Sequence, residues 1–433
     1  MILLRGGRVV DPAGGLDGLL DILVDGGSIT AVGPGIDSAA ERTVDARGLI
    51  IVPGLIDMHV HLREPGDEAK ETILTGVRAA VRGGFTSVCA MPNTRPVNDR
   101  RDITERILAE ARRAGLANVL PIAAITRASG GRDLVDMADL VAAGAVAFSD
   151  DGRPVTDSRV MRRALEAAAA AGSLVVDHCE DRALAEDGAI NEGRVSARLG
   201  LPGIPAAAEE VMVARDIILA EAARTRVHIA HLSTAGGVRM AGEAKARGVR
   251  VSVEATPHHL LLTDEAAGSG DANFKMNPPL RSEADTAALV EALRTGVVDV
   301  IATDHAPHTA EEKSRGLTAA PFGVVGLETA VSLVLDRLVR PGTISLPRFV
   351  ELLSTRPARL LGLARKGHIA PGADADLTVL DPDLQITVDK ARFESKGRNT
   401  PFDGWKLRGG PVMTIVGGRI VYPFDGGGPA GRP

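Results

Sequence analysis

The chain has 433 residues, a formal net charge of −6, 45% apolar residues and 24% charged residues. This composition is typical of a globular enzyme, and the mild acidity provides no basic surface for nucleic acid. Asp, Arg or Gly interrupts every apolar run before it reaches the length of a membrane span, and the first residues lack a secretory signal pattern. We therefore expect a cytoplasmic protein whose two cysteines, Cys89 and Cys179, stay reduced.

The first 52 residues contain short strand-like runs separated by turn signals. Asp25-Gly26 lies between the runs Asp21–Val24 and Ile29–Val32, as in a β-hairpin. Two earlier runs, Ile2–Leu4 and Arg8–Val10, have the same character. This stretch is too short to bury a core of its own, so we expect it to need a partner.

Residues 53–366 alternate short apolar runs with longer amphipathic stretches such as Glu71–Arg82 and Ala206–Ala223. Such alternation predicts βαβ units and a parallel sheet, and eight units predict a closed (β/α)8 TIM-type barrel. The alternative is an open doubly wound sheet, but no Gly-rich phosphate loop follows an early strand. The eight predicted strands are Leu55–Met58, Phe85–Met91, Val119–Ile125, Ala145–Phe148, Leu174–Asp177, Val227–His231, Val249–Val253 and Val298–Thr303.

Residues 367–433 return to the character of the first 52. Ala375–Leu380 is strand-like, and Gly417-Gly418 separates two further runs as a hairpin turn. We expect the two ends, residues 1–52 and 367–433, to form one small β-sandwich domain beside the barrel. The Gly- and Pro-rich tail Asp425–Pro433 is predicted to be disordered.

The strongest chemical signal is His59-Val60-His61 at the end of the first predicted barrel strand. Residues i and i+2 of a strand share a face, so both imidazoles can reach one metal ion. The carboxyl ends of barrel strands form the active-site face. Two chance histidines in a turn are the alternative, but other strand ends carry metal-ligand residues at matching places.

Four further strand ends carry imidazole or carboxylate groups, a donor set that suits Zn²⁺. We expect two metal ions, the first held by His59, His61 and Asp304 and the second by His178 and His231, with a carboxylate as bridge. Two such ions can share one hydroxide, and Asp304 can act as general base and then general acid. The four segments are Ser149–Gly152, Asp177–Glu180, His228–His231 and Thr303–His308.

The remaining histidines carry less weight. His228 lies three residues before His231, so the two cannot point the same way from a strand. His305 should face away from its neighbour Asp304. His258 and His259 are as well explained as loop residues or as supports behind the site, and Cys179 as a packed core thiol.

Two motifs resemble those of the bacterial class I dihydroorotases, within the amidohydrolase superfamily. They are Asp57-Met58-His59-Val60-His61-Leu62-Arg63-Glu64-Pro65 and Ala302-Thr303-Asp304-His305-Ala306-Pro307-His308, followed by Lys313. The resemblance covers essentially the whole chain. It implies two Zn²⁺ ions per subunit, with Asp304 as both ligand and acid/base.

The resemblance also implies the bridging ligand. Many relatives use a carboxylated lysine, but the fourth predicted strand ends without one. Asp151 fits the subgroup that uses aspartate as the bridge, and Asp150 is the fallback.

Substrate contacts follow from the same resemblance. Arg63 would pair with the substrate carboxylate, helped by Asn93, and Asn277 and the backbone of Pro321-Phe322-Gly323 would contact the ring. His308 would support the carboxylate or the ring edge. His61 would also lie next to the substrate. A surface ion pair for Arg63 and turn formation for both asparagines are the alternatives. Ala306–Phe322 is polar and lacks a clear helix, which fits a mobile lid.

The implied activity is the reversible cyclisation of N-carbamoyl-L-aspartate to L-dihydroorotate in pyrimidine biosynthesis. Two alternatives stay open: another cyclic amidohydrolase, such as a hydantoinase, dihydropyrimidinase or allantoinase, or a non-catalytic partner of aspartate transcarbamoylase. A homodimer and a transcarbamoylase complex are possible assemblies. The sequence leaves the metal's identity open.

Overall fold

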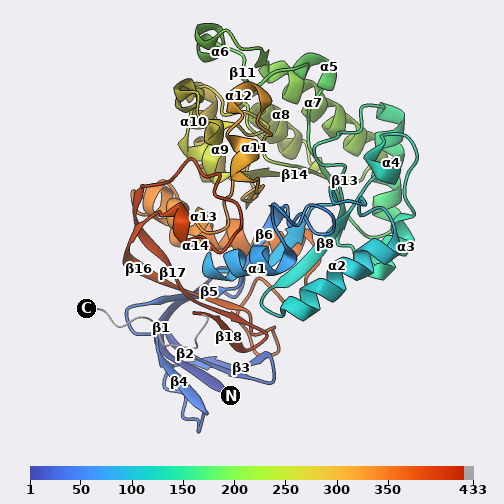
Figure 1. The fold of residues 1–433 in the computed structure, drawn as a ribbon. Coiled ribbons are helices and arrows are strands. Elements are labelled where there is room, and N and C mark those ends of the chain that lie inside the picture. The colour runs from blue at the N-terminus through green and yellow to red at the C-terminus, as the bar shows by residue number, and fades with distance from the viewer. Residues whose placement is uncertain (424–433) are drawn as a thin grey trace.

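The computed structural model describes residues 1–423, so the tail Asp425–Pro433 lies outside the described residues. Its largest part is a barrel of eight parallel strands, as expected (Figure 1). A bridge between Val60 and His305 brings the last strand back to the first. The strands, in order, are β6 (Leu55–Val60), β7 (Phe85–Ala90), β8 (Asn118–Ala123), β9 (Ala147–Phe148), β10 (Val175–Asp177), β13 (Arg226–Ile229), β14 (Arg250–Ala255) and β15 (Val300–Ile301).

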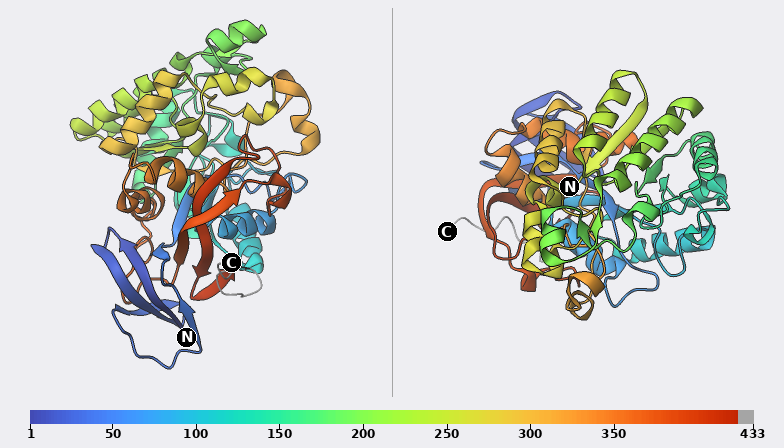
Figure 2. Two further views of the ribbon diagram at one scale, coloured as in Figure 1. Left: turned by 90° about the vertical axis from the view of Figure 1, so that its left-hand side faces the viewer. Right: turned by 90° about the horizontal axis from the view of Figure 1, so that it is seen from above.

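Helices surround these strands, which Figure 2 shows in the view from above. The predicted βα alternation includes a helix after each strand, but the amphipathic pattern of α8 is weak. In α8, the buried face consists only of Gly237, Ala241 and Ala244, so it has no run of large apolar residues. The outer helices are α1 (Ile73–Arg82), α2 (Arg101–Ala114), α3 (Met137–Ala143), α4 (Ser158–Ala170), α7 (Ala206–Ala223), α8 (Ala235–Ala246), α10 (Glu283–Thr295), α13 (Ala330–Val334), η4 (Leu335–Val339), α14 (Leu346–Val350), η5 (Glu351–Thr355) and α15 (Arg356–Leu360).

Short elements between strands and helices stand above the barrel in Figure 1. Two of them lie within Ala306–Phe322, so the expectation that this segment lacks a helix is wrong. The first, α11, begins with a capping box in which Thr309 and Glu312 bond each other's backbone N–H. The short elements are η1 (Arg127–Ser129), α5 (Arg182–Ala185), β11 (Ile190–Asn191), α6 (Arg194–Leu199), β12 (Gly203–Ile204), α9 (Pro257–Leu261), η2 (Asp264–Ser269), η3 (Ala272–Phe274), α11 (Ala310–Lys313) and α12 (Gly316–Ala319).

The barrel strands are buried on both faces, which explains why their apolar residues do not alternate with exposed polar ones. One core cluster lies between the strands and the outer helices. A smaller cluster lies inside the barrel, as shown by its members, which come from strands on all sides of the barrel. That cluster includes Met58, Cys89, Ile122, Ala147, Val176 and Val300.

Both chain ends contribute to one small β domain beside the barrel, as expected (Figure 1). Its strands form one sheet, not two separate ones, and this sheet divides at β1, which pairs with β4 through residues 2–5 and with β5 through residues 8 and 9. The elements are β1 (Ile2–Asp11), β2 (Leu16–Asp25), β3 (Ser28–Gly33), β4 (Arg42–Asp45), β5 (Ile50–Pro53), β16 (Leu377–Thr387), η6 (Lys390–Arg392), β17 (Lys406–Val416) and β18 (Arg419–Tyr422).

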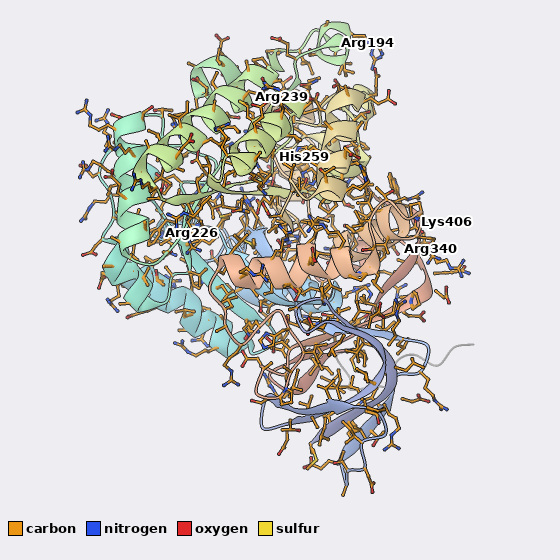
Figure 3. All side chains as sticks on the ribbon, turned by 180° about the vertical axis from the view of Figure 1, so that it is seen from behind. Arg194, Arg226, Arg239, His259, Arg340 and Lys406 are labelled. Carbon is orange, nitrogen blue, oxygen red and sulfur yellow. The ribbon has the colours of Figure 1, made fainter. Side chains whose placement is uncertain are left out.

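Charged side chains cover the outside of the molecule. Arg194 projects from α6 and Arg239 from the outer helix α8, whereas His259 lies deep within the barrel domain (Figure 3). Among the described residues, no helix is long and apolar enough to cross a membrane. The domain limits at 52/53 and 366/367 stay a prediction.

Candidate active site

His59 and His61 lie at the carboxyl end of β6 and both face the centre of the barrel mouth. The ring of His59 is fully buried, with Nδ1 2.7 Å from the carboxylate of Glu254 and Nε2 3.4 Å from Asp151. His61 Nε2 lies 3.0 Å from Asp304. Each imidazole lies within 3.6 Å of both Asp151 and Asp304, so the two point toward the same pair of carboxylates, as their spacing predicts.

Asp151 lies among four imidazoles. Its carboxylate oxygens are 3.4–3.7 Å from ring nitrogens of His59, His61, His178 and His231. Asp151 forms one group with His59 and His61 and another with His178 and His231. In each group, the candidate ligand atoms all lie within 4.8 Å of one another. Asp151 thus occupies the position that a bridging ligand requires.

Asp150, the fallback for this bridge, faces elsewhere. Its carboxylate accepts hydrogen bonds from the backbone N–H groups of Ile125 and Thr126 and from the Thr126 hydroxyl. These contacts tie the end of β9 to the loop after β8. The Asp150 carboxylate therefore has a structural role, and it is not a member of either histidine group.

His178 and His231, from the ends of β10 and β13, face each other. His178 Nδ1 is 2.9 Å from His231 Nε2. Behind His178, Glu180 accepts a 2.6 Å hydrogen bond from Asn277. Burial alone would raise the pKa of Glu180, but its hydrogen bond with His178 and the charge of that imidazole lower this pKa to about 2.

Asp304 follows β15 and completes the cluster. Its backbone φ is 47°, and the φ angles of His231 and Arg63 are 29° and 61°. Non-glycine residues adopt such left-handed conformations at a cost, and these conformations often occur at functional sites. Here they turn three candidate site residues toward one cavity.

The electrostatics of the cluster favour ionised carboxylates. Burial alone would raise the pKa of Asp304, but the imidazoles of His61 and His59 hold it well below its usual value. The same balance holds for Asp151, whose pKa is lowered chiefly by His59 and His231. Ionised carboxylates are the form that binds a divalent cation, and a bound cation would displace the protons of the neighbouring imidazoles.

Unsatisfied atoms provide a test of whether this cluster fits metal ions. Within residues 1–423, the buried atom His59 Nε2, which faces Asp151 and Asp304, has no hydrogen-bond partner. A buried polar atom without a partner is costly, and a metal ligand is one explanation for it. Four imidazoles and two carboxylates also match the donors that Zn²⁺ prefers. The residues therefore fit a two-metal centre.

A third group of possible ligands differs from the first two. Asp177, Cys179 and Asp216 lie together in the core, but Arg215 lies 3.3 Å from Asp177 and 2.7 Å from Asp216. The guanidinium already supplies the positive charge that these carboxylates need. Cys179 is buried and contacts both carboxylates, in keeping with a packed thiol.

The His/Asp cluster forms part of the wall of a cavity of about 200 Å³. Arg63 lies in the same wall, where it donates to Pro307 O and approaches His308 Nε2 at 3.3 Å. Arg63 is therefore part of the cavity and not a surface ion pair. The lining residues are His61, Arg63, Asn93, Asp151, Gly152, His178, His231, Asn277, Asp304, Ala306, His308, Phe322 and Gly323.

Both asparagines with predicted substrate contacts also line the cavity. Asn93 Oδ1 lies 2.8 Å from His61 Nδ1, and its amide nitrogen donates to Asp151. Asn277 donates to Glu180, and its side-chain oxygen is buried without a partner among the described residues. They are thus more than turn formers, because their side chains contact the cluster.

The backbone of Pro321-Phe322-Gly323 takes part in hydrogen bonds within its own surroundings. Gly323 N–H donates to Lys275 O, and Gly323 O accepts from Lys313 Nζ and from Asn399. Phe322 O accepts from His308 Nε2. These bonds hold the loop against the cavity, and the contact of this backbone with the substrate ring stays a prediction.

Glu254 is a neighbour of the cluster that the sequence patterns missed, and it contacts His228, to which they gave less weight than to His231. Glu254 lies in β14 with its carboxylate fully buried, between His59 and His228. A charged residue directly after the apolar run Val249–Val253 was the available signal. His305 faces away from Asp304 toward Glu71, and His259 bonds Thr256 and Pro278 behind the site.

Fold and site together define a metal-dependent cyclic amidohydrolase. A solved structure, the L-hydantoinase (dihydropyrimidinase) from Arthrobacter aurescens, matches with a TM-score of 0.86 and 27% identity, over 97% of this chain and 95% of that one. The "Dihydro-orotase-like" family model matches residues 48–236.

Curated relatives narrow the class. A dihydroorotase from Pelotomaculum thermopropionicum is 57% identical over 97% of this chain and 98% of its own. Another from Syntrophus aciditrophicus is 51% identical, over 98% of this chain and 100% of its own. The chain belongs to the dihydroorotase family and is a cyclic amide hydrolase.

Proposed function

We propose that this chain interconverts N-carbamoyl-L-aspartate and L-dihydroorotate through the residues of the 200 Å³ cavity. The observation that carries the proposal is one cavity wall that combines the His/Asp cluster with the half-buried Arg63. An amide carbonyl at the cluster and a carboxylate at the guanidinium are the two features of dihydroorotate that such a wall would recognise.

The cluster would hold two Zn²⁺ ions, with His59 and His61 at one, His178 and His231 at the other, Asp151 between them and Asp304 as a further ligand. When bound, the ions supply Lewis acidity and an activated water. Metal analysis of the purified protein tests this assignment. Two equivalents of zinc per chain would support it, and a protein that takes up no divalent cation would contradict it.

Asp304 would move the proton. In ring opening, water adds its oxygen to the amide carbon while the C–N bond breaks, and Asp304 takes a proton from the water and delivers it to the leaving nitrogen. The second proton stays with the new carboxyl group. Ring closure therefore requires a protonated carboxylic acid, so acid favours dihydroorotate and alkali favours the open form.

Replacement of the acid/base tests its role. In Asp304→Asn, kcat should fall by a factor of 10²–10⁴, the usual contribution of general acid–base catalysis. Zinc content should be measured in parallel, since Asp304 is also a proposed ligand. A variant with full zinc and unchanged kcat would rule out the acid/base role.

The runner-up is a hydantoinase, dihydropyrimidinase or allantoinase activity. Such enzymes usually have a bridging lysine, which is absent here, and substrates without a carboxylate need no Arg63. Assays with dihydroorotate, hydantoin and allantoin separate the alternatives. Turnover of hydantoin or allantoin without turnover of dihydroorotate would overturn the proposal.

A non-catalytic role as a scaffold for aspartate transcarbamoylase would require loss of the metal site, whereas all candidate ligands are present here. We propose an active cytoplasmic enzyme that can still pair with itself or with that transcarbamoylase. For self-association, the outward face of α7 is a candidate surface, because Val211 and Ile218 are 44% and 62% exposed. Light scattering, alone and with the transcarbamoylase, tests both assemblies.

A further inference from the structure

Glu254 is a fully buried carboxylate behind the His/Asp cluster, outside the cavity. It contacts one member of each proposed ligand pair. Its Oε1 lies 2.7 Å from His59 Nδ1 and accepts a 3.1 Å hydrogen bond from the backbone N–H of His231. Its backbone carbonyl accepts from Leu232, the next residue. Glu254 therefore joins β6 and β13 directly beneath the site.

The hydrogen-bond roles along this chain of groups are fixed by chemistry. A carboxylate only accepts, so Nδ1 of His59 must carry a proton, and in the neutral form that binds a metal the lone pair is then on Nε2. That Nε2 is the buried atom without a partner, 3.4 Å from Asp151. The tautomer that Glu254 imposes thus directs the free lone pair of His59 at the proposed cation.

His228 holds the other oxygen of Glu254. His228 Nε2 lies 3.1 Å from Glu254 Oε2, and His228 Nδ1 lies 2.8 Å from the hydroxyl of Ser252. If Ser252 donates to Nδ1, then Nε2 carries the proton and donates to the carboxylate. A directed series of hydrogen bonds thus leads from Ser252 through His228 and Glu254 to His59.

We infer that Glu254, oriented by His228, is a positioning residue that sets the metal affinity of the His/Asp cluster by fixing the tautomer of His59 and the backbone at His231. This inference rests on the proposed metal centre. It assigns a task to two buried residues that have no place in the proton transfer or in substrate contact. Loss of such a partner typically weakens metal binding 10- to 100-fold.

The test is a competitive Zn²⁺ titration of the full chain against a chromogenic chelator. Glu254→Gln keeps the size of the side chain but removes its charge, and we expect the Zn²⁺ affinity to fall about 10- to 100-fold. Excess Zn²⁺ should then restore kcat. With Co²⁺ in place of zinc, the visible absorption bands should change, because the geometry at His59 is altered.

Glu328→Gln is the matched control, because Glu328 is a buried carboxylate, 4% exposed, that contacts none of the proposed ligands. The Zn²⁺ affinity of the Glu328→Gln variant should equal that of the unmodified chain. If Glu254→Gln does not fold, His228→Gln, which leaves the carboxylate in place, should weaken Zn²⁺ binding several-fold.

Three outcomes would overturn the inference. They are an unchanged Zn²⁺ affinity in Glu254→Gln, an equal loss in Glu328→Gln, and, where only His228→Gln folds, an unchanged affinity in that variant. Failure of the proposed function is recognised separately, because the unmodified chain would then bind no divalent cation before any variant is compared.

Discussion

Arg63 reaches the cavity because its backbone takes a φ of 61°, directly after the His59-Val60-His61 segment. The guanidinium is buried, which lowers its pKa, although the carboxylates of Asp304 and Asp67 oppose this shift. It has no bidentate carboxylate partner among the described residues, only Pro307 O and His308. A half-buried guanidinium in a cavity wall, with donors to spare, is suited to a carboxylate ligand.

Arg63→Lys keeps the charge but loses the fork of donors. We expect KM for dihydroorotate to rise about 10- to 100-fold with a smaller change in kcat, since the contact contributes mainly to binding. Steady-state kinetics measure both constants. The control is Arg95→Lys, because the Arg95 side chain is 75% exposed and should be insensitive. Equal KM values in the two variants would exclude a carboxylate contact for Arg63.

At the level of elements, the barrel was predictable because strands buried on both faces leave long apolar runs, and because ligand residues follow them. The strands themselves can be very short: β9 and β15 have two residues each. The amphipathic pattern of α8 is weak, since Gly237, Ala241 and Ala244 give its buried face too little hydrophobicity. The use of the Gly323 backbone within its own loop also has no local sequence signal, because the partners come from distant segments.

Gly323 shows how tightly that loop is packed. Its φ is 130°, and a Cβ there would lie 2.7 Å from Ala306 Cβ and 3.1 Å from His308 Nε2. Gly323→Ala should therefore displace His308 and raise KM at least about tenfold, besides a backbone strain of about 1–3 kcal/mol. Urea unfolding and kinetics separate the two effects.

Gly316→Ala is the control within the same segment. Its φ is 75°, but a Cβ there meets nothing within 4 Å. It should lose stability through backbone strain alone and keep its KM. If both variants bind substrate equally well, the packing around Gly323 does not shape the cavity.

Over the whole molecule, the barrel and the C-terminal segment are joined by buried carboxylates. Glu71 of the barrel accepts a hydrogen bond from the Ser395 hydroxyl, and Glu328 accepts from the backbone N–H groups of Glu394 and Ser395.

The pKa values of the two carboxylates shift in opposite directions. Burial is opposed at Glu71 chiefly by His305, which leaves its pKa lowered. At Glu328, burial prevails over the backbone donors and Arg82, and the pKa rises to about 7.

This difference predicts a pH-dependent stability. The folded state holds the Glu328 proton up to about pH 7, whereas the unfolded chain releases it near the ordinary value of 4.5. Stability should therefore fall as pH rises through this window. Glu328→Gln cannot ionise, so relative to the unmodified chain it should gain roughly 2–3 kcal/mol in unfolding free energy between pH 5 and pH 8.

Urea unfolding of both proteins at saturating zinc, at pH 5 and pH 8, measures this gain. The Glu71→Gln variant has the opposite expectation: it loses the stabilising contacts of an ionised carboxylate and should be less stable at both pH values. A Glu328→Gln difference that is the same at pH 5 and pH 8 would mean that Glu328 is ionised throughout. The contact of Glu328, just before α13, with Glu394 and Ser395 would then be an ordinary charged one, with Arg82 as its counter-ion at 3.5 Å.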